Sequence, residues 1–187
     1  MTFEPGTVLT TRRLVLRPFA ESDIDDVLEA GRDPEMLRWM PFASRRTPAQ
    51  ARDWCTRLAH QDPEGQIHFA VVGRSGRCDG SVGLDRADWA AGQAELGYWI
   101  APWARHQGYA TEAVRAVVAY ARRTGLHRIE LLAAHGNLSS LGVAERAGFA
   151  RAAGVAPGGR ADMALLTLET ARETSPGTSP GTTRGTT

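Results

Sequence analysis

The chain has 187 residues, of which 42% are hydrophobic and 23% are charged, and its formal net charge is +1. This length suffices for one domain with a substantial core. The near-neutral charge gives no indication of nucleic acid or an anionic membrane as a partner, and no apolar run approaches the ~20 residues that cross a bilayer. We therefore expect a cytoplasmic protein whose two cysteines, Cys55 and Cys78, are reduced thiols.

The composition changes near Thr170. Residues 171–187 are dominated by Ser, Pro, Gly and Thr, and Ser-Pro-Gly occurs twice in this stretch. Such a segment cannot bury enough apolar surface to offset the entropy lost on ordering. The sequence thus predicts one domain over residues 1–170, followed by a disordered and dispensable tail.

In the first half of the domain, the spacing of apolar residues predicts alternating strands and helices. Helix signals are Ser22 as an N-cap, Gly31 as a stop, and a capping box at Thr47 with proline at the first helical position. The expected elements are a strand over 13–19, helices over 21–31 and from Thr47, and strands over 66–73 and 79–88 that form a hairpin around Arg74-Ser75-Gly76-Arg77.

The second half predicts a crossover in which a helix connects two strands. The expected elements are strands over 94–100 and 128–134, a helix over 111–123 between them, a short helix over 139–148, and a last strand over 161–169. Hairpins that come early and a crossover that comes later favour an α/β (α+β) fold. We expect a mixed, mostly antiparallel sheet with helices on both faces.

The turn over residues 105–112, Arg-His-Gln-Gly-Tyr-Ala-Thr-Glu, is the most informative segment. The first amides of a helix have no partner within it and carry the positive end of its dipole, so they favour an anion. Gly108 lets the backbone approach a phosphate closely, and Arg105 and His106 can add side-chain donors. The other interpretation is a tight turn that uses Gly108 for its conformation alone.

These residues resemble a known signature. Residues 105–110 are similar to the Arg/Gln-x-x-Gly-x-Gly/Ala motif of the GNAT acyl-CoA N-acyltransferases. The segments TTRRLVLRPFAESDIDDVLE, AELGYWIAPWARHQGYATEAVRAVVAYA and RIELLAAHGNLSSLGVAERAGF resemble the branch that contains the Rim-type ribosomal-protein N-terminal acetyltransferases. The resemblance covers residues 9–169 and gives no information about the substrate.

The resemblance implies how acyl-CoA is bound. One strand is expected to splay away from its neighbour near Ile100, which opens a wedge in the sheet. The pantetheine arm would pair with the freed backbone, and the pyrophosphate would bind the amides of the turn. The cofactor-binding residues implied in this way are Trp99, Ile100, Ala101, Arg105, His106, Gln107, Gly108, Tyr109, Ala110 and Thr111.

Two further residues follow from the resemblance. Asn137 occupies the position of an asparagine that faces the cofactor, and Ser140 matches a serine that protonates or hydrogen-bonds the departing CoA thiolate. Their structural alternatives are a helix cap for Asn137 and an ordinary place in the first helical turn for Ser140. Gly148-Phe149 is a landmark of the family that we interpret as a helix end and a core aromatic.

The implied reaction is direct transfer of an acetyl group from acetyl-CoA, or another acyl group from its acyl-CoA, to a primary amine. Holding both reactants side by side supplies much of the rate, and a strand amide can stabilise the oxyanion. Glu95 is the candidate general base, with a structural carboxylate paired to an arginine as the alternative. Some Rim-type enzymes carry a carboxylate after the Gly-Phe landmark, whereas this chain has none there until Asp162. An α-amine, whose unperturbed pKa is ~8, hardly needs a strong base.

Several alternatives stay open for the acceptor, the donor and the activity itself. The apolar run Trp39-Met40-Pro41-Phe42 would suit a protein N-terminus or a small amine, whereas an antibiotic amine would need acidic residues, for which Asp62 and Glu64 are the nearby candidates. A succinyl donor would need a cation such as Arg38, Arg45 or Arg46. A CoA-binding protein without catalysis is the alternative from another class.

The sequence gives no indication of a metal site or of an oligomeric state. The histidines His60, His68, His106, His127 and His135 are scattered without metal-ligand spacing, so we expect no metal. The protein can be a monomer or a homodimer on this information alone.

Overall fold

The computed structural model describes residues 1–40, 47–60, 62–153, 156 and 160–169. The predicted tail over 171–187 lies outside these residues, as do Pro41, Phe42, Arg45 and Arg46. Within the described part, no helix combines the length and the apolar character that spanning a membrane requires.

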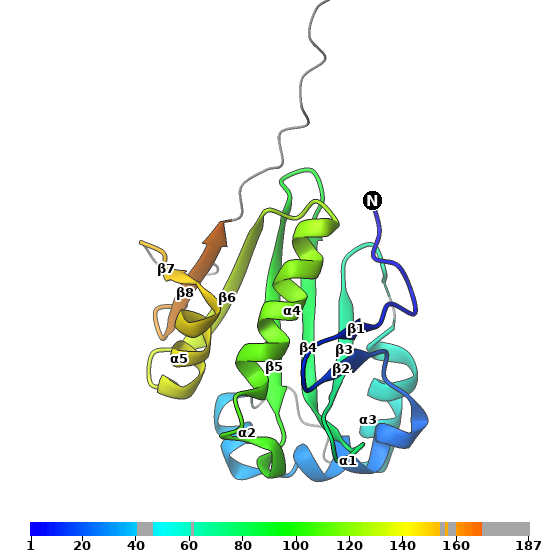
Figure 1. Ribbon diagram of the computed structural model, residues 1–187. Helices are drawn as coiled ribbons and strands as arrows, with labels where there is room; N and C mark the ends of the chain where they lie inside the picture. Colours follow the sequence, from blue (N-terminus) through cyan, green and yellow to red (C-terminus); the bar gives the residue numbers. More distant parts are fainter. Residues whose placement is uncertain (41–46, 61, 154–155, 157–159, 170–187) are drawn as a thin grey trace, which may run out of the picture.

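A single mixed sheet forms the centre of the described structure (Figure 1). Its strand order is β1-β2-β3-β4-β5-β6-β8-β7, and every neighbouring pair is antiparallel except β5 and β6. The mostly antiparallel sheet is therefore confirmed. The strands are β1 (Leu9–Thr10), β2 (Val15–Arg17), β3 (Ile67–Val72), β4 (Cys78–Asp88), β5 (Gln93–Ile100), β6 (Arg128–Ala134), β7 (Ala150–Arg151) and β8 (Met163–Glu169).

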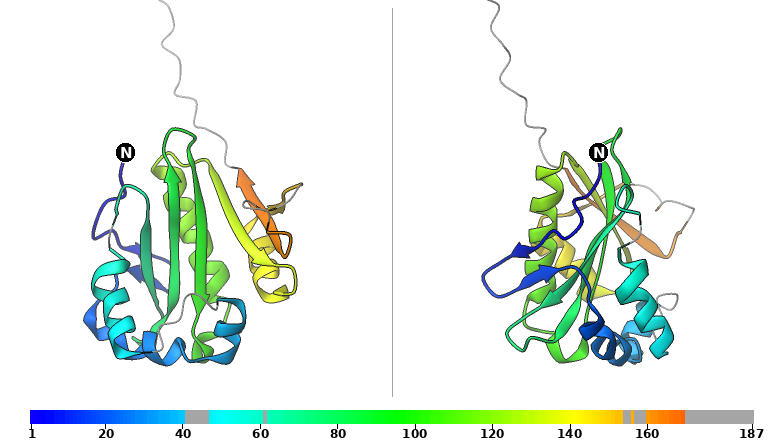
Figure 2. Two further views of the ribbon diagram at one scale, coloured as in Figure 1. Left: turned by 180° about the vertical axis from the view of Figure 1, so that it is seen from behind. Right: turned by 90° about the vertical axis from the view of Figure 1, so that its right-hand side faces the viewer.

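Helices cover both faces of the sheet, as predicted (Figure 2). On one face lie α4 (Tyr109–Arg123) and α5 (Leu138–Ala147), which share a core with alternate residues of the strands. On the other face a second core lies under α1 (Ile24–Ala30), α2 (Pro34–Trp39) and α3 (Pro48–Asp53), the last of which continues as one π-helical turn over Trp54–Leu58. Short 3-10 turns over Glu21–Asp23 and Pro102–Ala104 precede α1 and α4.

The sequence signals predict some helix ends correctly and others not. Gly31 ends α1, and the Thr47 capping box begins α3. Ser22 is not an N-cap, because a 3-10 turn occupies its position and the Asp23 carboxylate accepts the Ala20 amide at 2.8 Å. Helix α2 was not predicted, although Asp33 caps it and Pro34 occupies its first turn.

Strands β5 and β6 separate partway along their length. They share three residue pairs, from Gln93↔Arg128 to Glu95↔Glu130, and β5 then runs on to Ile100 without β6 beside it. The sequence placed the separation near Ile100, whereas pairing already ends after Glu95. The predicted wedge is thus present and extends from Leu96 to Ile100.

We predict that Asp23 is a main stabilising group of the α1 side. Its buried carboxylate accepts both terminal nitrogens of Arg17, at 2.7 and 2.8 Å, as well as the Ala20 amide. Because Arg17 is partly exposed, Asp23→Asn should lower the free energy of unfolding by about 2 kcal/mol, which urea denaturation would measure. The matched variant Asp25→Asn, at an exposed position of α1, should change it by less than ~0.5 kcal/mol. Equal effects of the two variants would contradict this assignment.

Candidate active site

The first turn of α4 has no capping side chain among the described residues. Gly108 is its N-cap, in the left-handed conformation with φ +76°, and the Glu112 amide already donates to the Gly108 carbonyl. By contrast, side chains cap α2, α3 and α5. The amides of Tyr109, Ala110 and Thr111 therefore carry the positive end of the longest described helix without a side chain to receive them. This is the geometry of an anion cradle.

A network from the N-terminal segment holds this turn in place. Arg13 donates to the Gln107 carbonyl at 2.8 Å and to the Glu112 carboxylate at 2.7 Å, and its guanidinium lies over the Tyr109 ring. Thr11 donates its hydroxyl to the same carboxylate at 2.7 Å. Burial alone would raise the pKa of Glu112, but the hydrogen bonds from Thr11 and Arg13 and the Arg13 charge outweigh burial, so that its pKa is lowered. The sequence does not identify these partners.

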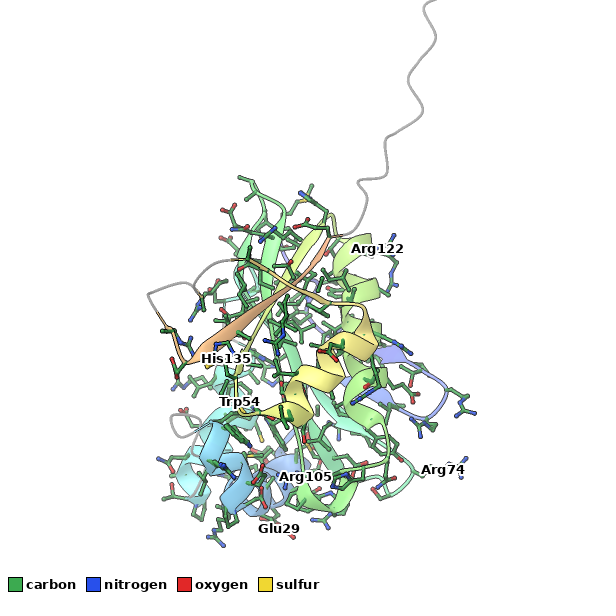
Figure 3. All side chains as sticks on the ribbon, turned by 90° about the vertical axis from the view of Figure 1, so that its left-hand side faces the viewer. Glu29, Trp54, Arg74, Arg105, Arg122 and His135 are labelled. Atoms are coloured by element: carbon green, nitrogen blue, oxygen red, sulfur yellow. The ribbon has the colours of Figure 1, made fainter. Side chains whose placement is uncertain are left out.

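Arg105 is engaged inside the protein. Its Nε donates to the Ile100 carbonyl at 3.2 Å, and its guanidinium forms an ion pair with Asp33, the cap of α2. Figure 3 shows Arg105 at the same end of the molecule as Glu29 of α1. Burial would raise the pKa of Asp33, but hydrogen bonds from Arg105 and the Met36 amide outweigh burial and lower it. Contact of Arg105 with a phosphate stays a prediction. The same holds for His106, which is exposed and has a positive φ of 61°.

The register of β4 and β5 decides which backbone groups face the wedge. Trp99 lies opposite Ser81, and the Ala101 amide donates to the Asp79 carbonyl at 2.9 Å, so the polar groups of both Trp99 and Ala101 point towards β4. Because successive residues alternate, the groups that face the wedge belong to Leu96, Tyr98 and Ile100. The prediction of freed backbone at Trp99 and Ala101 is therefore wrong. Of the predicted three, only Ile100 has backbone groups on this side, and its carbonyl is bound by Arg105.

Tyr98 and Ser140 meet across the wedge. The Tyr98 hydroxyl donates to Ser140 Oγ at 3.1 Å, so that a side chain from β5 reaches the first turn of α5. Asn137 caps this helix, because its Oδ1 accepts the Ser140 amide at 3.0 Å. Burial raises the pKa of Tyr98, although the hydrogen bond to Ser140 opposes this. The helix-cap alternative for Asn137 is confirmed, whereas its contact with a cofactor and the role of Ser140 in catalysis stay predictions.

Glu95 lies at the closed end of the wedge on the face that bears α1, α2 and α3. It is bound by Arg86, whose Nη1 lies 2.5 Å from Glu95 Oε2. This is the structural alternative that the sequence left open, a carboxylate paired with an arginine. Asp162 is exposed in the turn before β8, where its backbone carbonyl accepts the amide of His135, the residue that follows β6.

A groove of about 660 Å³ lies beside the cradle, between the β1–β2 turn and α4. It includes Gly108, Thr111, Arg12 and Arg115 in its lining, but no residue of the wedge. The groove and the wedge are therefore separate features of the surface.

The remaining predicted positions are partly described. Trp39 lies close to Gly136 and donates its indole nitrogen to Glu35 at 2.7 Å, while Arg38 stacks over the Trp39 ring. Cys55 and Cys78 are buried, reduced thiols in the core. Burial, and secondarily the Asp23 charge, raises the pKa of Cys78, so it is not a nucleophile. The described residues contain no group of three or more metal-ligating side chains.

Comparison with known proteins identifies the family. The family model described as an acetyltransferase (GNAT) domain matches residues 13–150. The chain therefore belongs to the GNAT acetyltransferase family and is a transferase.

Two relatives agree with this membership. The "Uncharacterized N-acetyltransferase p20" of Bacillus licheniformis is 30% identical over 125 residues, which cover 65% of this chain and 70% of the relative. The "Putative ribosomal N-acetyltransferase YdaF" of Bacillus subtilis (strain 168) is 33% identical over 119 residues, covering 60% of this chain and 63% of the relative. The match thus spans slightly less than two thirds of the second relative.

Solved structures share the fold. A structure described as "a putative ribosomal-protein-serine acetyltransferase from Vibrio cholerae" superposes with a TM-score of 0.72 at 24% identity, covering 90% of this chain and 99% of the other. The spermidine N-acetyltransferase from Vibrio cholerae in complex with CoA and spermine has a TM-score of 0.72 at 18% identity, covering 86% and 97%. At these identities the likeness establishes the fold alone.

We predict a pH-dependent contribution of Glu112 to stability. Glu112→Gln should lower the free energy of unfolding by about 1–2 kcal/mol at pH 7, since it weakens charged hydrogen bonds to Thr11 and Arg13. The folded-state pKa of Glu112 lies below the unfolded value of about 4.3, so the contribution is full above that value and is lost as the pH falls through the folded-state pKa.

Urea denaturation of wild type and variant between pH 7 and pH 3 would measure this difference. Glu145→Gln, at an exposed position of α5, is the matched control and should show no such gap. A difference between wild type and Glu112→Gln that stays constant down to pH 3 would contradict the prediction.

Proposed function

We propose that this transferase moves an acetyl group from acetyl-CoA directly to a primary amine, with both substrates bound at once. The observation that carries the proposal is the uncapped N-terminus of α4 beside the wedge between β5 and β6. A ligand with an anionic group and an extended chain can bind both features at once, the anion at the helix N-terminus and the chain in the wedge. Acyl-CoA has both parts, a pyrophosphate and a pantetheine arm that contains amides.

The donor would bind by backbone contacts. The amides of Gly108 to Thr111 would hold the pyrophosphate, with Gln107 and His106 at the margin of the cradle. The pantetheine amides would add to the β5 edge formed by Leu96, Tyr98 and Ile100, in the manner of an extra strand. A strand amide on this edge would also hold the developing oxyanion of the thioester carbonyl.

The residues of the wedge would assist departure of the CoA thiolate. Tyr98 donates into Ser140 Oγ, which leaves the Ser140 proton free to point elsewhere. When the carbon–sulfur bond breaks, sulfur keeps the electron pair and takes this proton, and the Tyr98 proton can replace it on Ser140. Because the pKa of Tyr98 is raised, its hydroxyl is protonated at neutral pH and can serve as the donor.

Two classes of acceptor have support. The names of YdaF and of the Vibrio cholerae ribosomal-protein-serine acetyltransferase favour a protein N-terminal α-amine, as in the Rim-type branch, and hence a cytoplasmic enzyme. Three half-buried apolar side chains could contact an N-terminal peptide: Trp39 of α2, and Leu132 and Leu165, which lie opposite each other on the sheet face away from α4 and α5.

The second class of acceptor is a cationic small amine such as a polyamine. Asp85 and Glu95 lie opposite each other, and Glu130 pairs with Glu95, so three carboxylates follow one another across the strands. A structural neighbour is titled a spermidine N-acetyltransferase. For a succinyl donor, the required cation would be Arg38 among the described candidates.

The function is tested by release of CoA thiol from acetyl-CoA in the presence of an amine panel. The panel contains a peptide with a free N-terminal serine, its N-acetylated form, and spermidine, and succinyl-CoA replaces acetyl-CoA in a parallel series. We expect release with acetyl-CoA and one of the free amines, and none with the blocked peptide. Micromolar acetyl-CoA binding without turnover of any amine would instead support a CoA-binding protein that lacks catalysis.

We predict that one negative charge in the cradle weakens donor binding without destabilising the fold. Thr111 is the third residue of α4, where an aspartate stabilises the helix dipole but repels a phosphate. Thr111→Asp should weaken acetyl-CoA binding by about tenfold or more, which corresponds to 1.4 kcal/mol or more. Calorimetric titration would measure the affinity, and thermal unfolding should show no loss of stability.

The matched variant Thr111→Asn has almost the same shape without the charge, and should bind acetyl-CoA within about threefold of wild type. Equal affinities of the Asp and Asn variants would contradict the anion cradle.

We predict that Ser140 acts on the chemical step. Ser140→Ala should lower kcat by about tenfold to hundredfold, because the thiolate loses its proton donor, while the affinity for acetyl-CoA stays within about twofold. Ser139→Ala is the control, since Ser139 is the exposed neighbour in the same turn. A normal kcat in Ser140→Ala would exclude this role.

A further inference from the structure

Asp85 and Gly97 define a site on the open face of β4 and β5. In Figure 2 (left), α1, α2 and α3 lie along the lower end and one side of this face and leave the upper part of β4 and β5 uncovered. The residues on this face alternate with those that point to α4. His68 lies opposite Gly83, Gly83 opposite Gly97, and Asp85 opposite Glu95.

Gly97 leaves a stretch of bare backbone beside the wedge. It is exposed, and a Cβ atom added there would meet a single neighbour, Asp85 Oδ2 at 3.8 Å. The residues on either side of Gly97, Leu96 and Tyr98, are those whose backbone groups face the wedge. Among the described residues, the side chain that such a Cβ would contact is therefore that of Asp85.

The Asp85 carboxylate lies beside Gly97 in a fixed orientation. His68 Nε2 lies 3.0 Å from Asp85 Oδ1, which leaves Oδ2 on the side of Gly97. The His68 side chain is 11% exposed and its ring lies over Gly83, where an added Cβ would be 2.4 Å from Nδ1. The edge of Trp54 packs against the same ring with centroids 5.0 Å apart. The His68 ring is thus held in place by its neighbours, and its hydrogen bond orients the Asp85 carboxylate.

Glu95 is less suited to the same task. Arg86 Nη1 lies 2.5 Å from Glu95 Oε2, so a guanidinium occupies the carboxylate oxygen that an incoming ammonium ion would need. Asp85 is 38% exposed and has no arginine partner among the described ion pairs.

We propose that Asp85, positioned by His68, receives the acceptor amine over Gly97 and takes its proton. The inference rests on the proposed function. The acceptor arrives as an ammonium ion, and one proton passes to Asp85 Oδ2. The nitrogen lone pair then forms the bond to the thioester carbon, the carbon–sulfur bond breaks, and sulfur keeps the electron pair. Of the three ammonium protons, one passes to Asp85 and then to solvent, one stays on the amide nitrogen, and one is lost from the nitrogen as the amide forms. That last proton balances the one that Ser140 gives to the CoA thiolate.

The test compares steady-state rates in Asp85→Asn, His68→Gln, Glu95→Gln and Gly97→Val, with calorimetric titration of acetyl-CoA for each. The amine probes are the N-terminal serine peptide and spermidine. Asp85→Asn should lower kcat/KM for the amine about 10²- to 10³-fold, while acetyl-CoA affinity stays within about twofold. His68→Gln, a positioning variant, should lose about tenfold. Gly97→Val should raise KM for the amine, because it places a side chain where the amine would lie.

The pH profile separates a base from a structural carboxylate. The charged groups that face Asp85 are His68 on β3, Arg86 on β4 and Glu95 on β5. Without the base, kcat/KM of Asp85→Asn should rise about tenfold per pH unit up to the pKa of the amine, whereas wild type should level off at lower pH. Asp53→Asn, in an exposed ion pair with Arg57 on α3, is the matched control and should behave as wild type.

Two outcomes overturn the proposal. If Asp85→Asn keeps its activity within about threefold while Glu95→Gln loses it, Glu95 is the base and the proposed function stands. If wild type binds acetyl-CoA but acetylates neither probe, the proposed function fails, and the role of Asp85 fails with it.

Discussion

Strands β5 and β6 share three residue pairs and then diverge, and the site depends on this divergence. The backbone groups of Leu96, Tyr98 and Ile100 face the gap. Backbone amides and carbonyls that are buried without a hydrogen-bond partner cost free energy. The helix pair α4 and α5 covers one face of the gap, and the Tyr98–Ser140 hydrogen bond connects its two sides. An open strand edge inside a sheet can pair with another extended chain. Here the edge belongs to β5, the strand that leads into the turn before α4.

The charged side chains around the turn that begins α4 bind one another and leave the amides of that turn without a side-chain partner. Two arginines that could neutralise an anion directly are instead bound by carboxylates, Arg13 by Glu112 and Arg105 by Asp33. Both arginines also fix the position of the turn, because Arg13 binds the Gln107 carbonyl and Arg105 binds the carbonyl of Ile100 at the end of β5. Side-chain charge thus fixes the geometry, and the helix N-terminus supplies the attraction for an anion.

The sequence predicts the parts of the site that depend on local chemistry. Gly108, the helix after it and the crossover to β6 follow from turn residues and apolar periodicity, and the structure confirms them. The orientation of backbone groups in β5 was predictable in principle, since Trp99 and Leu96 are apolar residues of opposite parity that must face different cores.

Partners distant in sequence could not be predicted in this way. Arg13 and Glu112 are 99 residues apart, and Arg105 and Asp33 are 72 residues apart. A single sequence shows that a charge is present, but not which of several opposite charges folding brings against it. For the same reason the sequence does not show that Arg86 binds Glu95, or that Asp85 lies beside the bare backbone of Gly97.

The ties from Thr11 and Arg13 to Glu112 also constrain the order in which the protein can assemble during synthesis. The N-terminal segment emerges first, yet the carboxylate that fixes it follows about 100 residues later, which at 5–20 residues per second means a delay of roughly 5–20 s. Until then the first strands have no α4 to pack against. The turn therefore reaches its binding geometry only after more than half of the chain has left the ribosome.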